Sequence, residues 1–227
     1  MRVLLRVADI LERIAQVFGR IGAWLILPLI AVIMFDVITR KLPAVQFYIA
    51  SHPVLRDWMS PTKLQELEWH LHTALFLLAL GFAYTMNAHV RVDLVRERFA
   101  ARRQAWIELF GLCVFLFPYL FVMIWLSWDF MVRAYVSNEA SPSMTGLPQR
   151  WIIKSFVPLG LSLVACAGLA TFLRHVVFLF GPAHRREEVK MNTLSTAESQ
   201  HLPKIDDLPE FDDDPAAVAE AVVPPRT

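Results

Sequence analysis

The sequence predicts an all-α membrane protein with four transmembrane helices, an N-terminal amphipathic interfacial helix and a disordered acidic C-terminal tail. Two observations lead to this fold class. Hydrophobic residues make up 56% of the 227 positions and charged residues 19%, whereas soluble domains have about 45–50% and about 25%. The hydrophobic residues also come in four blocks, each near the roughly 20 residues that a helix needs to cross a bilayer core.

Residues 1–20 are predicted to form an amphipathic helix at the membrane interface. Polar and apolar residues recur at helical spacing on opposite faces. The polar set is Arg2, Arg6, Asp9, Arg13, Gln16 and Arg20, and the apolar set is Val3, Val7, Ile10, Ile14 and Val17. A cleaved signal peptide does not fit, because Asp9 and Glu12 interrupt its basic region and no cleavage site of small residues follows.

Residues 21–39 form the first predicted span, and Asp36 is the one charge within it. Pro28 is a candidate kink, which a membrane helix tolerates. Asp36 has two interpretations. It lies at headgroup depth beside Arg40 and Lys41, or it makes a polar contact with a partner helix.

Residues 40–65 form a long connection interrupted by three prolines. Its aromatic residues favour the membrane interface, so we expect short helical pieces there. Ser60 followed by proline predicts a helix N-cap. The next helix therefore starts outside the hydrocarbon and enters it near Trp69, and we assign residues 66–90 to the second span.

The remaining segments follow from the same alternation of apolar blocks and charged or turn-rich stretches. They are residues 91–105 as a basic loop, 106–128 as the third span, 129–150 as an outward loop, 151–180 as the fourth span and 181–227 as a disordered tail. Between residues 206 and 220 the tail has seven acidic residues and no Lys or Arg, a composition typical of disorder.

The distribution of Lys and Arg predicts the orientation of the spans. Thirteen of these residues lie near the spans on the side that holds both termini, and seven lie on the other side. Since the basic side of a membrane protein faces the cytoplasm, both termini are predicted to be cytoplasmic. The 40–65 connection and the 129–150 loop then face outward.

The two ends of the second span carry the candidate functional residues. Glu66 and His70 are four residues apart, as are Glu68 and His72, so each pair shares a helix face. A metal site, acid–histidine pairs favoured by the helix dipole and an interaction surface all remain possible interpretations. At the inner end, His89, Arg91 and Asp93 follow the apolar run, and Arg91 is placed to reach lipid headgroups.

Other functions find less support. Haem could bind between four helices, so a haem-binding redox membrane anchor is kept as the alternative, although the histidines lie at helix ends. The sequence has no HExxH or GxSxG motif and no CxxC metal site, which argues against a membrane enzyme. No basic stretch is interleaved with aromatic residues for nucleic acid. A stand-alone carrier is a further alternative.

Small residues mark two helix faces suited to close packing. They are Gly81, Ala83 and Ala88 in the second span and Ala165, Ala167, Gly168 and Ala170 in the fourth. These faces fit either contact among the four helices or contact with a partner.

Two stretches resemble a known family. AYTMNAHVRVDLV (residues 83–95) and SPSMTGLPQRWIIKSFVPLGLSLV (residues 141–164) are similar to the small, Q-type (DctQ-like) membrane subunit of TRAP transporters, the tripartite ATP-independent periplasmic carriers. The resemblance covers roughly residues 21–180. The long 40–65 connection and the acidic tail depart from shorter members.

The resemblance implies a small permease subunit in the bacterial cytoplasmic (inner) membrane. Its partners would be the lipid bilayer, a large multi-span permease subunit and a periplasmic solute-binding protein for carboxylate-type solutes. Sodium coupling would belong to the large subunit, so no cofactor is expected here. In this setting Glu66, Glu68, His70 and Glu139 would contact the binding protein, while His89, Arg91 and Asp93 would anchor the cytoplasmic turn.

Overall fold

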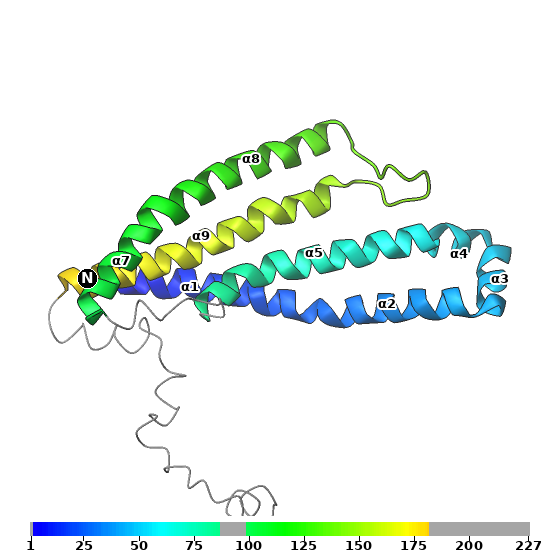
Figure 1. Cartoon of the computed structure of the whole chain (residues 1–227). Coiled ribbons are helices and arrows are strands. Elements are labelled where there is room, and N and C mark those ends of the chain that lie inside the picture. The colour runs from blue at the N-terminus through cyan, green and yellow to red at the C-terminus, as the bar shows by residue number, and fades with distance from the viewer. Residues whose placement is uncertain (1, 87–98, 182–227) are drawn as a thin grey trace, which may run out of the picture. The chain divides into compact units, whose positions relative to one another are not determined.

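The computed structural model describes residues 2–86 and 99–181 (Figure 1), which belong to the first of two units into which the chain divides. Every regular element in these residues is a helix, so the predicted all-α class is confirmed. The helices are α1 (Arg2–Trp24), α2 (Ile26–Lys41), α3 (Pro43–Ser51), α4 (Pro53–Trp58), α5 (Pro61–Thr85), α7 (Ala101–Gly111), the π-helical turn η1 (Leu112–Leu116), α8 (Phe117–Val136) and α9 (Trp151–Phe180).

Three helical runs among the described residues are long and apolar enough to cross a membrane. They are Arg2–Lys41, Arg102–Val136 and Trp151–Phe180, which contain the first, third and fourth predicted spans. α5 is not among them, because its first three turns hold Lys63, two acids and two histidines. The second span therefore stays a prediction.

α1 and α2 form one run with a break at Leu25, close to the candidate kink at Pro28. The amide of Leu25 donates to the carbonyl of Gly22 at 3.0 Å, one residue short of the α-helical pattern. Since proline has no N–H, the carbonyl of Trp24 loses its helical partner. A proline three residues on thus accounts for the break.

The predicted amphipathic helix is present, but it has three faces. Its predicted polar and apolar faces are both largely exposed. A third face of small residues packs against α5 and α9; it consists of Ala8, Ala15, Gly19 and Gly22. Its location at the membrane interface stays a prediction.

The long helices form an open row, in the order α2, α5, α9 and α8 (Figure 1). α9 contacts α5 on one side and α8 on the other, while α1 lies along both α5 and α9. Within residues 2–86 and 99–181, the outer helices of the row contact α5 or α9 along one side, and much of their remaining surface is exposed.

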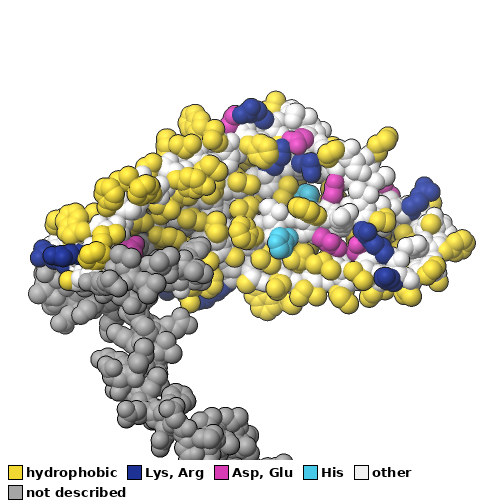
Figure 2. Space-filling view, viewed as in Figure 1, with side chains coloured by type: hydrophobic (Ala, Val, Ile, Leu, Met, Phe, Trp, Pro, Cys, Tyr) yellow, Lys and Arg dark blue, Asp and Glu magenta, His cyan; other side chains and the backbone are white. Residues whose placement is uncertain are grey.

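Buried residues on the outer helices recur every seven positions, which is the spacing of a single narrow seam. On α8 they are Leu120, Ser127 and Ala134, and on α2 Leu29 and Asp36 follow the same interval, with Thr39 as a further buried residue. Most of the remaining side chains of these helices are exposed, and hydrophobic side chains cover much of the surface over α8 (Figure 2).

α5 and α9 approach each other closely because glycines replace side chains at their contact. A Cβ atom on Gly81 would lie 2.9 Å from Cβ of Leu163, and one on Gly160 would lie 2.7 Å from the carbonyl oxygen of Leu77. Both distances are too short for a real contact. Of the predicted small-residue faces, Gly81, Ala167, Gly168 and Ala170 are buried, and Ala88 lies outside the described residues.

We expect Gly160→Ala to destabilise the protein, because the added methyl group meets the backbone of α5 and the helices must separate. Overpacking of this kind costs about 1–3 kcal/mol. Gly111→Ala is the matched control, since nothing lies within 4 Å of its Cβ position. The midpoint of unfolding in detergent should fall for the first variant and not for the second, and equal midpoints would contradict the close contact.

Candidate partner-contact site

The predicted partner-contact residues lie at the end of the bundle where α5 and α9 begin. There the loop of residues 137–150 connects α8 to α9 and approaches the first turns of α5. Ser60 caps α5, as predicted, by accepting a hydrogen bond from the amide of Lys63 at 3.3 Å. This cap fixes the start of the helix that carries Glu66.

Glu66 holds the loop against α5 with both carboxylate oxygens. Oε1 accepts a hydrogen bond from the hydroxyl of Ser141, and Oε2 accepts one from the amide of Leu147 at 2.6 Å. A Cβ atom on Gly146 would lie 2.8 Å from Oε1, so the loop backbone comes close only because this residue is glycine. The carboxylate thus joins two sides of the loop to α5.

The loop also has hydrogen bonds of its own. The amide of Ser141 donates to the carbonyl of Leu147 at 3.2 Å, and the amide of Arg150 donates to the carbonyl of Glu139 at 2.9 Å. Asn138 and Gln149 have positive φ angles of 45° and 60°, a conformation that Asn adopts more readily than Gln. The loop is therefore a closed, ordered structure with a turn at each end.

Glu139 is engaged within the chain as well. Its carboxylate forms an ion pair with Lys154 on α9, and the Lys154 ammonium lies 3.9 Å from the centroid of the Phe130 ring on α8. Such a cation–π contact is favourable where the cation is shielded from water, and the Lys154 side chain is only 15% exposed. Glu139 thus ties the base of the loop to two helices.

The other two predicted contact residues point in different directions. His70 is half-buried, and its Nδ1 hydrogen-bonds with the backbone carbonyl of Glu66 rather than with the carboxylate. Glu68 is half-buried on the side of α2, near the charges of Asp36 and Arg40. The four predicted residues therefore form two neighbouring clusters. Glu66, Glu139 and His70 lie at or beside the loop, and Glu68 lies on the side of α2.

The carboxyl group of Glu66 lies in the second turn of α5, three residues before Trp69, and has a shifted pKa. Burial acts to raise this pKa. The hydrogen bonds from Ser141 and Leu147, together with the positive charge of Arg150, outweigh burial and hold it below its ordinary value of 4.5. Glu66 is therefore ionised at neutral pH, and its charge stabilises the closed loop.

The hydrogen-bond and ion-pair partners of Glu66 and Glu139 were not predicted from the sequence, because they lie far away in the chain or belong to the backbone. The turn-rich composition of residues 137–148 predicts a loop and not its fixed shape. At the tip of this loop Met144 is fully exposed. An exposed methionine on an ordered loop is the feature of this end best suited to touch another protein.

A separate polar cluster lies at the opposite end of the bundle. Arg174 on α9 forms ion pairs with Asp9, at 3.0 Å, and with Glu12 on α1. These groups line a hollow of about 660 Å³ together with Arg6, Arg13 and Gln16. The pairs attach the polar side of α1 to α9. His89, Arg91 and Asp93, the predicted cytoplasmic anchor, lie outside the described residues.

Residues 29–178 match the family model described as tripartite ATP-independent periplasmic transporters, DctQ component. The chain belongs to the DctQ family. The match includes α5, α8 and nearly all of α2 and α9, and both contact clusters at the loop end of this DctQ protein lie within it. No curated protein and no solved structure matches the chain. Among the described residues of this transporter component, no group of three His, Cys, Asp or Glu side chains could hold a metal ion.

We expect Glu66→Gln to loosen the loop. The substitution removes the charge but keeps one acceptor oxygen, so the hydrogen bond from the Leu147 amide loses its charge assistance, about 1 kcal/mol. Hydrogen–deuterium exchange at the Leu147 amide should therefore become roughly 5-fold faster. Asp129→Asn is the control, because it removes a carboxylate charge on α8 outside the loop, where Asp129 pairs with Arg133, and leaves the contacts of Glu66 in place. Equal exchange in wild type and Glu66→Gln would contradict the role of Glu66.

The same amide should report the ionisation of Glu66. A folded-state pKa below the ordinary value means that the charge stabilises the closed loop above pH 4.5, and that this contribution is lost as the pH falls through the folded-state pKa. The protection factor of Leu147, corrected for the intrinsic exchange rate, should therefore fall below this pH. In Glu66→Gln it should show no such step.

Proposed function

We propose that this DctQ protein is the small permease subunit of a TRAP transporter that works in the bacterial inner membrane. It serves as a membrane scaffold that supports the large multi-span transport subunit and helps to dock the periplasmic solute-binding protein. The transporter takes up a carboxylate-type solute with sodium coupling. Solute and sodium sites then belong to the two partners.

The open row of helices is the observation that carries this proposal. α8 buries three residues along a single seam, while aromatic side chains such as Phe121 and Trp125 are about 70% exposed. A protein that formed a transport path alone would need helices that enclose a polar interior. A row with long free sides is suited to lie against a larger membrane protein, with small faces available for close contact.

We propose α5 as the fourth membrane span. Its buried residues Ala74, Leu78 and Gly81 face the neighbouring helices, and α1, α2 and α9 all contact it. A helix between two candidate spans in the same row has the position expected of a span. Four spans place both termini on the same side of the membrane, and the distribution of Lys and Arg assigns that side to the cytoplasm. The loop of residues 137–150 then faces the periplasm.

Docking of the solute-binding protein is proposed to depend on this loop. In this proposal Glu66 and Glu139 act by holding the loop in shape, while Glu68 and His70 lie beside it and the exposed tip around Met144 makes the contact. His89, Arg91 and Asp93 are proposed to anchor the cytoplasmic turn. The haem alternative has no support among the described residues, since His70 and His175 belong to opposite ends of the bundle.

The tagged chain should copurify with the large permease subunit from gentle detergent. Sodium-dependent solute uptake should be lost when the chain is deleted and return when it is supplied again. Transport by the chain alone in vesicles, or uptake that continues after its deletion, would overturn the scaffold proposal.

Met144→Asp tests the docking part of the proposal in the same assay. Loss of an exposed anchor at an interface costs about 1–2 kcal/mol, so the affinity for the binding protein should fall roughly 5- to 30-fold while the membrane complex stays assembled. Arg133→Gln is the control, because it lowers the charge on the same side by the same amount and lies outside the loop. Unchanged uptake in Met144→Asp would remove the tip from the docking site.

A further inference from the structure

A pocket of about 310 Å³ lies at the elbow where α2 ends and the chain returns through α3 and α4 into α5. Its polar walls include Arg40, Arg56 and Gln46, and its apolar walls include Ile49, Ala50 and Met59. We propose that this pocket binds the phosphate headgroup of an anionic phospholipid together with the first part of an acyl chain. The proposal concerns this chain alone and does not depend on the transporter function.

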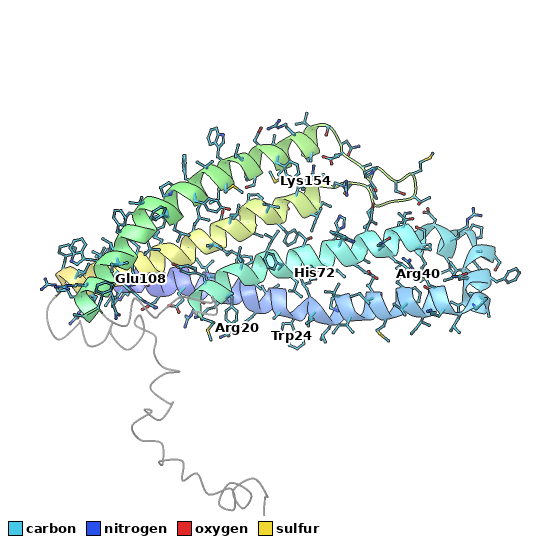
Figure 3. All side chains as sticks on the ribbon, in the orientation of Figure 1. Arg20, Trp24, Arg40, His72, Glu108 and Lys154 are labelled. Carbon is cyan, nitrogen blue, oxygen red and sulfur yellow. The ribbon has the colours of Figure 1, made fainter. Side chains whose placement is uncertain are left out.

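Arg40, labelled in Figure 3, is held in place for such a ligand by a buried acid. Nε of Arg40 forms an ion pair with Oδ2 of Asp36 at 2.8 Å, and the Asp36 side chain is only 9% exposed. This ion pair lies on the Nε side of the guanidinium group. The two terminal nitrogens of Arg40 have no hydrogen-bond partner among the described residues and remain available at the pocket wall, where they can bind phosphate through two parallel hydrogen bonds.

Asp36 pairs with Arg40 on its own helix, in line with the first of the two interpretations from the sequence, and among the described residues it has no polar contact with another helix. Its Oδ1 atom is buried without a hydrogen-bond partner in the described part of the chain. A buried carboxylate depends strongly on its one cation. The pair is therefore a stable support for the guanidinium group, and the pocket wall is formed before a ligand arrives.

Arg56 supplies the second positive charge from α4. No carboxylate in residues 2–86 or 99–181 forms an ion pair with it, and its side chain is exposed. The side-chain amide of Gln46 donates to the backbone carbonyl of Arg40 at 3.2 Å, which fixes the wall between the two arginines. The lining contains two guanidinium groups and no carboxylate. Asp36 balances the charge of Arg40 from outside the lining and Glu68 lies near both, so Arg56 supplies the net positive charge that favours an anion.

The position of the pocket favours a lipid over a soluble anion. Arg40 and Lys41 end the apolar run Arg2–Lys41, so the elbow lies at the boundary between membrane and water. Phe47 and Trp58 are 77% and 74% exposed beside it, as aromatic side chains are at headgroup level. A phosphate ion would leave the apolar wall of Ile49 and Met59 unused, whereas the chain of a phospholipid covers it.

The test uses the full chain, purified in detergent and examined by native mass spectrometry with added phosphatidylglycerol or phosphatidylcholine. Wild type should retain one phosphatidylglycerol and little phosphatidylcholine. Arg56→Gln should lower retention about tenfold, the usual effect of losing a charge-assisted hydrogen bond. Ala50→Phe should lower it as well, by filling the pocket without a change of charge, while Arg133→Gln should match wild type.

Three results would overturn the proposal. The first is equal retention in wild type and Arg56→Gln, a variant of an exposed residue that should fold normally even if Ala50→Phe does not. The second is equal retention of the two lipids. The third is displacement of phosphatidylglycerol by millimolar inorganic phosphate, or binding of phosphate alone with the same dependence on Arg56. Either form of this result would identify a site for a soluble anion.

Discussion

The close contact between α5 and α9 is the constraint on which the rest of the structure depends. At Gly81 and Gly160 the two helices approach nearly backbone to backbone, so their relative position has little freedom. α9 then provides the surface for α8, and α1 lies along both helices. The loop of residues 137–150 reaches Glu66 because α5 and α9 begin side by side. A change at the glycines would therefore move elements far from them.

Polar interactions in the described residues gather at the two ends of this helix pair, while the middle is held by shape. Glu66, Glu139 and Lys154 join the elements at one end, and Arg174 joins α1 to α9 at the other. Between them the contacts are those of glycine, alanine and leucine. This division suits a protein whose middle lies in hydrocarbon, where small residues allow helices to pack without the hydrophobic effect.

Local features of the chain were predictable from sequence, and long-range ones were not. Apolar blocks of about 20 residues predicted the spans that contain α2, α8 and α9, and the Ser60 cap was predicted from two adjacent residues. The bond between Glu66 and Leu147 joins positions 81 residues apart, and no local pattern encodes it. α1 shows a subtler limit: its two amphipathic faces were correct, but the face that packs consists of small residues that hydropathy does not single out. The acid–histidine pairs were predicted from spacing alone, and the Nδ1 atom of His70 instead hydrogen-bonds with a carbonyl.

The length of the helices has a consequence for the end of the bundle that holds Arg174. The 40 residues of the run Arg2–Lys41 correspond to a contour of about 60 Å at 1.5 Å per residue, and the 30 residues of α9 to about 45 Å. A bilayer core is only about 30 Å thick. With the elbow at one membrane surface, the first turns of α1 and the last turns of α9 extend past the other. Arg174, Asp9 and Glu12 can then meet in water, and the edge-to-face contact of Trp106 with Phe180 closes the base of a short helical stalk.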